Sequence, residues 1–494
     1  MILSSHHNSD NKRTTQEGTC EVIDLPEWPS ADYFPPDAMD RHLPELCAQI
    51  TGCRVFSWEC FCLMIEHCRL YRPPHLVSLL RMLVKDFLYD LKSVFLEPRQ
   101  RLNKADCLIV SNIPHNRLML MKTARRFAQC GKTVAWYGTP IIEADDETYA
   151  NNLVDLGSSS VSRWGQPRDI LKLWLSLPTA LYRGVILSHR MREAYAKIAK
   201  IKVRVSALQC ALHWMRLERC RWLMKRLRPK SVILGFDSVE FAGAVAISGY
   251  EQQAEVMVLQ HGVLNPVTVY SLATRIGCWS KDTCEYVQAL QISPQTRRTP
   301  ELKADVVGAI HAPERLSSLV DRKGVLFLGQ WADYTYWQWG GRSARAILHW
   351  LNQLQKSFPA VEWRFRPHPA ANPRDVPAGW IVSDYKSLRD DLECASVTIT
   401  MNSTSGVEAG AMGRPVIFLW SPEMVWLNAM ASLKALFVRS PDELVLRVGR
   451  LLNDPDFYQT YTDISMHLCS RHLGLHKNAV DTLVSIFLSE NEQA

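Results

Sequence analysis

A repeated alternation of short apolar runs with helical stretches constrains the fold more than any other feature of this sequence. The run CLIVS at 107–111 is followed by a polar loop, a helical stretch that ends near Cys130, then Gly131 and a second apolar run at 133–138. Strand, helix, glycine and strand in this order are typical of a βαβ unit, whose two strands lie parallel in one sheet. The pattern predicts an α/β protein.

The alternation occurs in two series, which predicts two domains in a chain of 494 residues. The first domain is expected at 105–310, with a helical insertion at about 166–228, and the second at 322–494. Between them, 310–322 has the composition of a linker. We expect the two domains to face a central crevice, in which ligands bind at the carboxyl ends of the strands. Further apolar runs lie at 231–236, 255–260, 275–280 and 304–309 in the first series, and at 324–330, 361–366, 381–384, 396–401 and 414–420 in the second.

The N-terminal part of the chain lacks this alternation. Residues 1–30 are polar and poor in large apolar side chains, which predicts a disordered tail. Residues 31–104 are expected to form a helical extension, because apolar residues recur at helical spacing in LVSLLRMLVKDFLYDLKSVF.

Composition excludes several classes of protein. Hydrophobic residues make up 47% and charged residues 22%, as in ordinary globular domains. The net charge of +7, from 57 basic and 50 acidic residues, is too small for this length to predict nucleic-acid binding. The fourteen cysteines are scattered without a CxxC pair, the polar start has no apolar signal region, and no run is long enough to span a membrane. These features predict a reduced, cytoplasmic protein.

The segment 200–230 is strongly basic and leaves two interpretations open. It contains ten basic residues and one acid, Glu218, with tryptophan and leucine between them. Such a segment could be a surface helix whose apolar side packs on its own domain, which we favour. It could also bind the anionic surface of the inner membrane, which would make the protein peripheral there.

Polar residues follow two strands of the predicted second sheet and are suited to bind phosphate. Parallel strands end at the same edge of a sheet, so both loops are expected there. A helix N-terminus favours an anion through its N–H groups and dipole, and hydroxyl, imidazole and guanidinium groups add donors. The candidates are Arg366, His368 and Pro369 after one strand, Asn402, Ser403, Thr404, Ser405 and Gly406 after the other, and Glu408 as an acceptor for ribose hydroxyls.

NSTSG and His368 also have structural explanations. A plain helix cap needs only one of the hydroxyls of NSTSG, and His368 alone could be an ordinary loop histidine. We favour phosphate because both loops occupy matched positions at the end of a strand.

Loops of the predicted first sheet contain the candidates for a general base. His261, in the Gln260-His261-Gly262 loop, or Asp237 could deprotonate an acceptor hydroxyl. Alternatively, His261 hydrogen-bonds only to backbone and Asp237 caps the next helix. Other candidates for the crevice are Asn112 and His115 after the first strand, and Gly329 and Gln330 after the first strand of the second domain.

Three motifs, VMVLQHG, RFRPHP and VTITMNSTSGVEAGAMGRPVIFL, resemble those of GT-B glycosyltransferases of bacterial surface-polysaccharide synthesis. The HP motif followed by a Ser/Thr motif is similar to that of CMP-sugar-dependent sialyltransferases and of the Kdo transferases of capsule and lipopolysaccharide. The resemblance implies two Rossmann-like domains, an acceptor site in the first and a nucleotide-sugar donor site in the second. It assigns the donor phosphate to His368, Ser403 and Thr404, and implies neither a metal nor any other cofactor.

The resemblance predicts a metal-independent glycosyltransferase that moves a Kdo- or sialic-type sugar from a CMP donor to a polysaccharide or lipid-linked glycan. The acidic motif that supplies the base in several sialyltransferases is missing, and Asp237 is the nearest substitute. Parts of the pattern are shared with other proteins. The alternatives are a CDP-polyol phosphotransferase of the teichoic-acid type, a UDP-sugar-dependent GT-B enzyme, a sugar-nucleotide epimerase, or a degenerate GT-B protein of glycan export without enzymatic activity.

Overall fold

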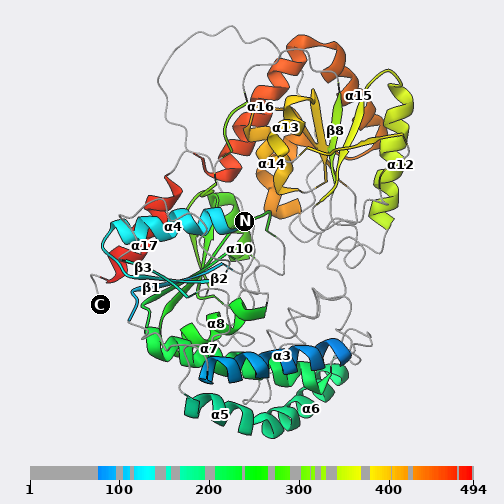
Figure 1. Ribbon diagram of the computed structural model, residues 1–494. Coiled ribbons are helices and arrows are strands. Elements are labelled where there is room, and N and C mark those ends of the chain that lie inside the picture. The colour runs from blue at the N-terminus through cyan, green and yellow to red at the C-terminus, as the bar shows by residue number, and fades with distance from the viewer. Residues whose placement is uncertain are drawn as a thin grey trace, which may run out of the picture. The chain divides into compact units, whose positions relative to one another are not determined.

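The described part of the chain forms two parallel β-sheets with helices packed on them (Figure 1). The predicted tail at 1–30 and most of the predicted extension at 31–104 lie outside the described residues. All described residues belong to the unit Phe34–Ala494. In this computed structural model they are 76–95, 104–111, 116–138, 152–156, 167–194, 206–235, 240–264, 273–289, 302–311, 313–316, 324–329, 342–368, 376, 379–385, 387–401, 403–420, 427–475 and 478–491.

The first sheet has seven strands, all parallel. Its central strands are continuous apolar runs because both of their faces are covered. Six of the strands match predicted apolar runs, and the short β3 was not predicted. In spatial order the strands are β3 (Leu153–Asp155), β2 (Val134–Gly138), β1 (Cys107–Ser111), β4 (Ser231–Leu234), β5 (Glu255–Leu259), β6 (Arg275–Cys278) and β7 (Lys303–Val306).

The second sheet has six parallel strands. Five of them match predicted apolar runs, and β13, a pair of residues, does not. In spatial order they are β10 (Ile381–Val382), β9 (Trp363–Arg366), β8 (Val325–Leu328), β11 (Val397–Thr400), β12 (Val416–Leu419) and β13 (Phe437–Val438).

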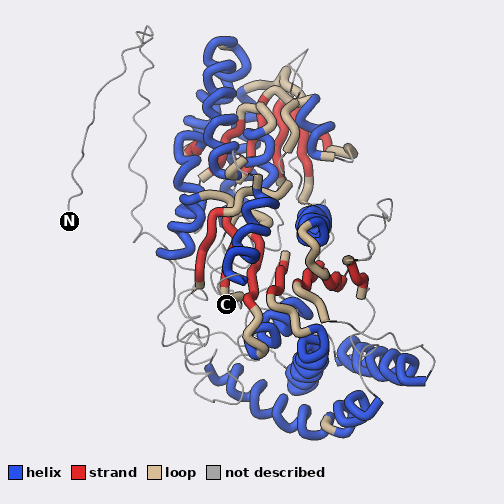
Figure 2. The backbone as a smooth tube through the Cα atoms, turned by 90° about the vertical axis from the view of Figure 1, so that its left-hand side faces the viewer, coloured by secondary structure: helices blue, strands red, loops and turns tan. Residues whose placement is uncertain are grey.

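Helices cover both faces of the first sheet, and Figure 2 shows the strands running between helices. Alternate residues of β1 point to opposite faces, so Ile109 lies in one core and Leu108 in the other. The first core is shared with α4 (Arg117–Gln129), and the second with α7 (Ala207–Leu227) and α8 (Glu240–Glu251). Helix α10 (Lys281–Ala289) connects β6 to β7.

The C-terminal helix α17 (Ala479–Asn491) packs on the first sheet beside α4 (Figure 1). Its Leu483 and Phe487 are buried in the same core as Ile109 and Trp136. This corrects the predicted boundary of the second domain, 322–494. The chain leaves the second sheet after α16 and returns to the first, so 479–491 belongs to the first domain.

The predicted helical insertion contains α5 (Pro167–Leu175), α6 (Leu177–Ala194) and α7, and α3 (Leu76–Phe95) packs against α7. The apolar side chains of α7, such as Leu212, Met215 and Leu223, are buried. The burial supports the favoured interpretation of the basic segment, a helix packed within its own domain. Among the described helices, no single one is long and apolar enough to cross a membrane. The bent pair Arg168–Leu175 and Leu177–Arg190 meets the criteria of length and composition.

In each sheet the strand order reverses at one point, where ligands of open α/β sheets usually bind. The reversal lies between β1 and β4 in the first sheet and between β8 and β11 in the second. The helical segments of the second domain are α12 (Arg342–Ser357), α13 (Leu388–Glu393), α14 (Thr404–Ala411), the 3₁₀ segment η6 (Leu427–Leu436), α15 (Pro441–Asn453) and α16 (Pro455–Leu473).

Candidate functional site

Helix α14 begins at the reversal point of the second sheet, directly after β11. Ser403 is its N-cap, and the Ser403 Oγ accepts a hydrogen bond from the backbone N–H of Ser405 at 3.2 Å. Ser403 is buried, whereas Thr404 and Ser405 are half-buried. The positive end of the helix dipole and three hydroxyl groups therefore lie at the carboxyl edge of the sheet, as predicted.

Two glycines fix α14 in this place. A Cβ at Gly406 would lie 2.4 Å from the Thr400 methyl group, and one at Gly410 would lie 2.4 Å from the Cys469 Sγ. The helix thus packs without a gap on β11 and on α16. Packing alone therefore requires the lack of a side chain at Gly406, one of the predicted phosphate-site residues.

The loop after β5 reaches α14 from the first sheet. The backbone N–H of Val263 donates to the Thr404 Oγ1 at 3.1 Å, and a Cβ at Gly262 would lie 3.2 Å from the same oxygen. The structure therefore brings the predicted Gln260-His261-Gly262 loop to the predicted Ser/Thr loop. A hydroxyl has one proton and two lone pairs, so Thr404 can accept this bond and still donate to a phosphate oxygen.

Gln260 holds that loop in shape instead of facing a crevice. It is buried, its Nε2 donates to the Gly262 carbonyl at 3.0 Å, and its Oε1 accepts from the Trp279 backbone N–H at 2.7 Å. The Trp279 indole N–H donates to the Gln260 carbonyl at 2.9 Å. With its amide engaged on both sides, Gln260 positions its half-buried neighbour His261.

The HP loop lies at the same edge, with one strand between it and α14. β9 pairs with β8, and β8 with β11, all parallel. At about 4.8 Å per strand, the ends of β9 and β11 are roughly 10 Å apart. His368 is half-buried two residues beyond β9. The intervening β8 is followed by the buried Gly329, where a Cβ would lie 2.6 Å from the Phe365 ring.

Arg366 has partners within its own domain. Its Nη1 donates to the carboxylate of the buried Asp391 and to the carbonyls of Tyr385 and Ser387, both at 3.1 Å. Arg366 therefore has a structural role, because its guanidinium ties the end of β9 to the start of α13. His368 follows this anchored residue by two positions.

Glu408 is the titratable group of α14. It lies four residues after Thr404, so the two side chains share one face of the helix. Burial raises the pKa of Glu408 to about 7. The protonated carboxyl group can donate to a phosphate oxygen, and the ionised one can accept from a hydroxyl. The neutral form does not repel an anion.

The remaining predicted site residues lie outside the described part of the chain. They are Asn112, His115, Asp237, Gln330, Pro369 and Asn402. Within the described ranges, no three His, Cys, Asp or Glu side chains are grouped as metal ligands.

Trp279 was missed by the sequence analysis. Besides bracing Gln260, its ring contacts that of His472 edge-on, with centroids 6.3 Å apart. A Cβ at Gly474, whose φ is +64°, would lie 2.0 Å from the Trp279 carbonyl oxygen. The end of α16 thus supports the loop that touches Thr404. Only the glycine after α16, a common helix terminator, signals this contact in the sequence.

No protein-family model matches the sequence, and no curated protein does. Among solved structures, a candidate UDP-N-acetylglucosamine 2-epimerase from Listeria monocytogenes aligns with 79% of this chain and 97% of its own, at 11% identity and a TM-score of 0.47. A UDP-GlcNAc 2-epimerase from Neisseria meningitidis aligns with 78% of this chain and 99% of its own, at 13% identity and a TM-score of 0.44. The glycosyltransferase SnogD from Streptomyces nogalater aligns with 77% of this chain and 99% of its own, at 12% identity and a TM-score of 0.41.

At these identities the likeness concerns the fold alone. The two parallel sheets, each with one reversal of strand order, make this chain an α/β protein of two Rossmann-like domains, the fold class expected from the sequence.

Proposed function

We propose that this protein is a glycosyltransferase that uses a nucleotide-sugar donor, most specifically a CMP-linked sugar of the Kdo or sialic type. The proposal rests on one observation: the N-terminus of α14 lies at the reversal point of the second sheet, and its Thr404 is contacted by the loop after β5. A donor phosphate at this helix end would lie beside residues of both domains.

Each described residue has a distinct part in this proposal. The backbone N–H of Thr404 and the hydroxyls of Thr404 and Ser405 bind the phosphate oxygens, because the N–H groups of Ser405 and Gly406 already donate to Ser403. His368 donates from the neighbouring loop. Glu408, on the Thr404 face, binds a ribose hydroxyl or donates to the phosphate while protonated. The choice of CMP rests on the resemblance of the HP and Ser/Thr motifs.

The reaction needs stabilisation of the leaving group. The acceptor hydroxyl oxygen forms a bond to the anomeric carbon, and the bond from that carbon to the phosphate oxygen breaks. The electron pair goes to the phosphate, so CMP leaves with one more negative charge, which the donors around α14 stabilise. The acceptor proton passes to a base, for which we propose His261, because its loop touches the phosphate-binding helix.

We place the acceptor, a surface polysaccharide or lipid-linked glycan, and the cytoplasmic location in the same proposal. Both rest on the motifs that resemble those of capsule and lipopolysaccharide transferases.

A thermal-shift screen with CMP, CDP, UMP and UDP tests the donor. CMP is expected to stabilise the wild type, because a ligand that binds only the folded state raises its stability. His368→Ala should lose most of that shift, whereas the exposed His467→Ala in the same domain should keep it. A larger shift with UDP would replace CMP by a UDP-sugar donor, and no shift with any nucleotide would contradict the enzymatic proposal.

Turnover is tested with CMP-Kdo or CMP-sialic acid and a glycan acceptor, by mass spectrometry. The acceptor should gain the mass of one sugar, and His368→Ala should lower kcat/KM about a hundredfold or more, the usual cost of losing a donor to developing charge. A gain of a phosphate-linked unit would identify a phosphotransferase instead.

A further inference from the structure

Helix α3 has one face fixed to the protein by ion pairs. Asp90, which is 1% exposed, accepts from the Arg219 Nη2 at 2.7 Å and from the Trp174 indole N–H at 2.7 Å. Asp86 accepts from the Arg219 Nη1 at 3.2 Å. Leu79 is buried on the same side of the helix. These contacts orient α3 and leave its opposite face to the outside.

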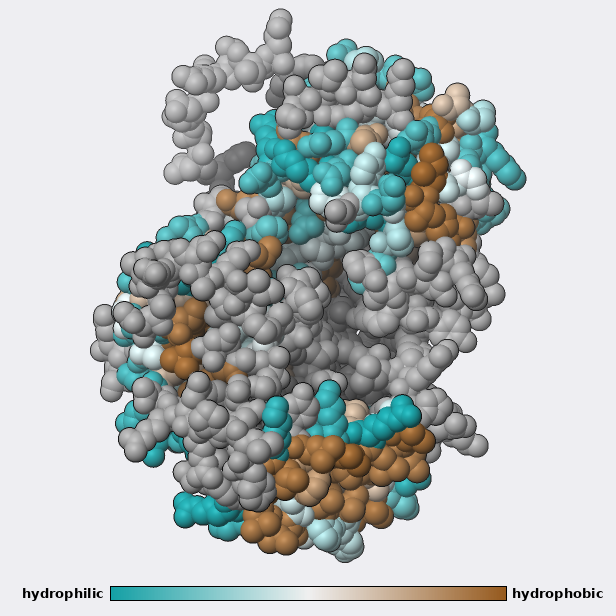
Figure 3. All heavy atoms as spheres, in the orientation of Figure 1, coloured by the Kyte–Doolittle hydropathy of each residue, from teal (hydrophilic) through white to brown (hydrophobic). Residues whose placement is uncertain are grey.

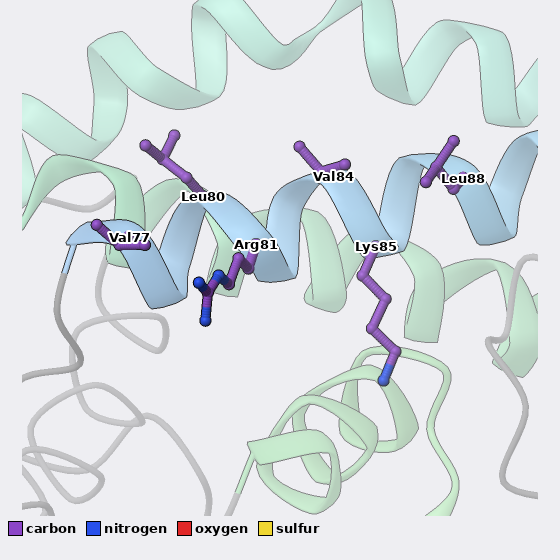
Figure 4. A pocket seen from close by; sticks show the side chains of 6 residues that line it. All are labelled: Val77, Leu80, Arg81, Val84, Lys85 and Leu88. Atoms are coloured by element: carbon purple, nitrogen blue, oxygen red, sulfur yellow. The ribbon is translucent and has the colours of Figure 1, made fainter.

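The opposite face is apolar and exposed. Five residues at helical spacing are each between 43% and 58% exposed: Val77, Leu80, Val84, Leu88 and Leu91. Figure 3 shows a brown patch at the place that α3 occupies in Figure 1. The side chains of Leu80, Val84 and Leu88 project from one side of the helix and line a shallow, open groove (Figure 4).

The charges of α3 are divided between the two faces. Arg81, Lys85 and Lys92 are exposed, and the first two line the same groove as the apolar side chains (Figure 4). Both acids of the range Leu76–Phe95, Asp86 and Asp90, point inward and are bonded to Arg219. The apolar stripe is therefore bordered by positive charge.

The apolar surface continues onto α5. The Phe87 ring of α3 contacts the Trp174 ring of α5 edge-on, with centroids 5.0 Å apart. Leu171, three residues before Trp174 and on the same helix face, is 60% exposed. The next residue, Lys172, is also exposed.

We propose that the outer face of α3, with the adjoining part of α5, binds the surface of an anionic lipid membrane. An apolar stripe bordered by lysine and arginine is the pattern of a helix that lies in the plane of the membrane interface. There the apolar side chains enter the boundary of headgroups and acyl chains, and the cations lie among the headgroups. This inference is independent of the proposed function.

The charges favour a membrane over a second copy of this chain. A two-fold symmetric dimer brings the same patch of both copies together. Arg81 and Lys85 of one copy would then approach those of the other, which costs free energy. An anionic membrane matches the same charges.

Sedimentation of the full chain with vesicles tests the proposal. One set of vesicles contains equal parts of phosphatidylglycerol and phosphatidylcholine, and the other contains phosphatidylcholine alone. The protein should sediment with the anionic vesicles, more weakly with the neutral ones, and less as salt is raised. Failure to sediment with anionic vesicles above the neutral level would overturn the proposal.

Two pairs of substitutions separate the apolar and the electrostatic parts. Val84→Gln with Leu88→Gln should lower the partition coefficient about tenfold or more. Arg81→Gln with Lys85→Gln should lower it about fivefold for each charge and remove most of the salt dependence. All four residues are exposed, so the fold should persist, which circular dichroism checks.

The matched control is Leu446→Gln with Lys281→Gln, two exposed positions on α15 and α10. It should bind vesicles as the wild type does. If the control lost binding as much as the α3 variants, or if the α3 variants kept it, the assignment to α3 would be overturned. It would also be overturned by a dimer in light scattering that Val84→Gln with Leu88→Gln dissociates, together with no vesicle binding.

Discussion

Helices α3 and α7 pack against each other, and each combines apolar residues with several basic ones, yet they place their apolar side chains in opposite directions. Helix α7 has neighbours on several sides, namely α3, α6 and α8, and four of its five leucines are buried. Helix α3 has its ion pairs to α7 on one side and an exposed stripe on the other. The burial of α7 supports the interpretation favoured from the sequence, whereas no sequence pattern pointed to the surface of α3. The difference shows that the neighbours of a basic, apolar helix decide whether it is core or surface.

Arg219 joins the two helices, and its removal should have the largest effect. Arg219→Met leaves Asp90 buried without its cation, which should lower the free energy of unfolding by about 3 to 5 kcal/mol. Chemical denaturation measures the change. Arg450→Met, whose surface pair with Asp454 spans 3.9 Å, should change it by less than about 1 kcal/mol. Equal losses would show that α3 does not depend on this buried pair.

Truncation of one leucine in each helix sharpens the comparison. Leu223→Ala in α7 should cost about 3 kcal/mol, because the side chain is 1% exposed and its loss leaves a cavity. Leu88→Ala in α3, where the side chain is 56% exposed, should change the free energy of unfolding by about 0.5 kcal/mol or less. A large loss at Leu88 would mean that another part of the protein covers this face in solution.

The stability of the protein should also depend on pH through His213, a buried residue of α7. Burial, assisted by the charge of Arg216, lowers the pKa of His213 to about 3. Below its ordinary pKa near 6.5, the unfolded chain binds a proton that the folded protein does not. Stability therefore falls as the pH drops from about 6.5 towards 3, by about 2 kcal/mol between pH 7 and pH 5.

Urea denaturation of His213→Gln at the two pH values tests this smaller effect. Relative to the wild type, the variant should gain about 2 kcal/mol on acidification. The exposed His467→Gln should behave as the wild type does. Parallel curves for His213→Gln and the wild type would contradict a buried, neutral imidazole at this position.

Much of the fold could be predicted from the sequence because strands buried on both faces are continuous apolar runs. The run at 107–111 matches β1 at both ends. The strands β3 and β13 have only three and two residues, and neither lies in one of the predicted apolar runs. The place of α17 on the first sheet depends on which apolar surface it meets after the chain has folded, and no local pattern contains that information.

For the candidate site, the placement of the loops could be predicted from the sequence, but individual side-chain contacts could not. The rule that parallel strands end at one edge brought the HP and Ser/Thr loops to the same edge, and the structure confirms that arrangement. The engagement of Arg366 by Asp391 could not be predicted, because it depends on where the start of α13 lies in space. The hydrogen bond between Gln260 and Trp279 could not be predicted either, because it joins the residues that follow two neighbouring strands, β5 and β6.

The return of α17 to the first sheet has a consequence for synthesis on the ribosome. The strands of the first sheet precede the second sheet in the chain, but Leu483 and Phe487, which complete one of the two cores of the first sheet, follow it. During translation of the whole second domain, the apolar side chains of α4 and β1 that meet α17 lack this cover. The first domain therefore reaches its final state only after the second has been made, and chaperones have that interval in which to bind the open face.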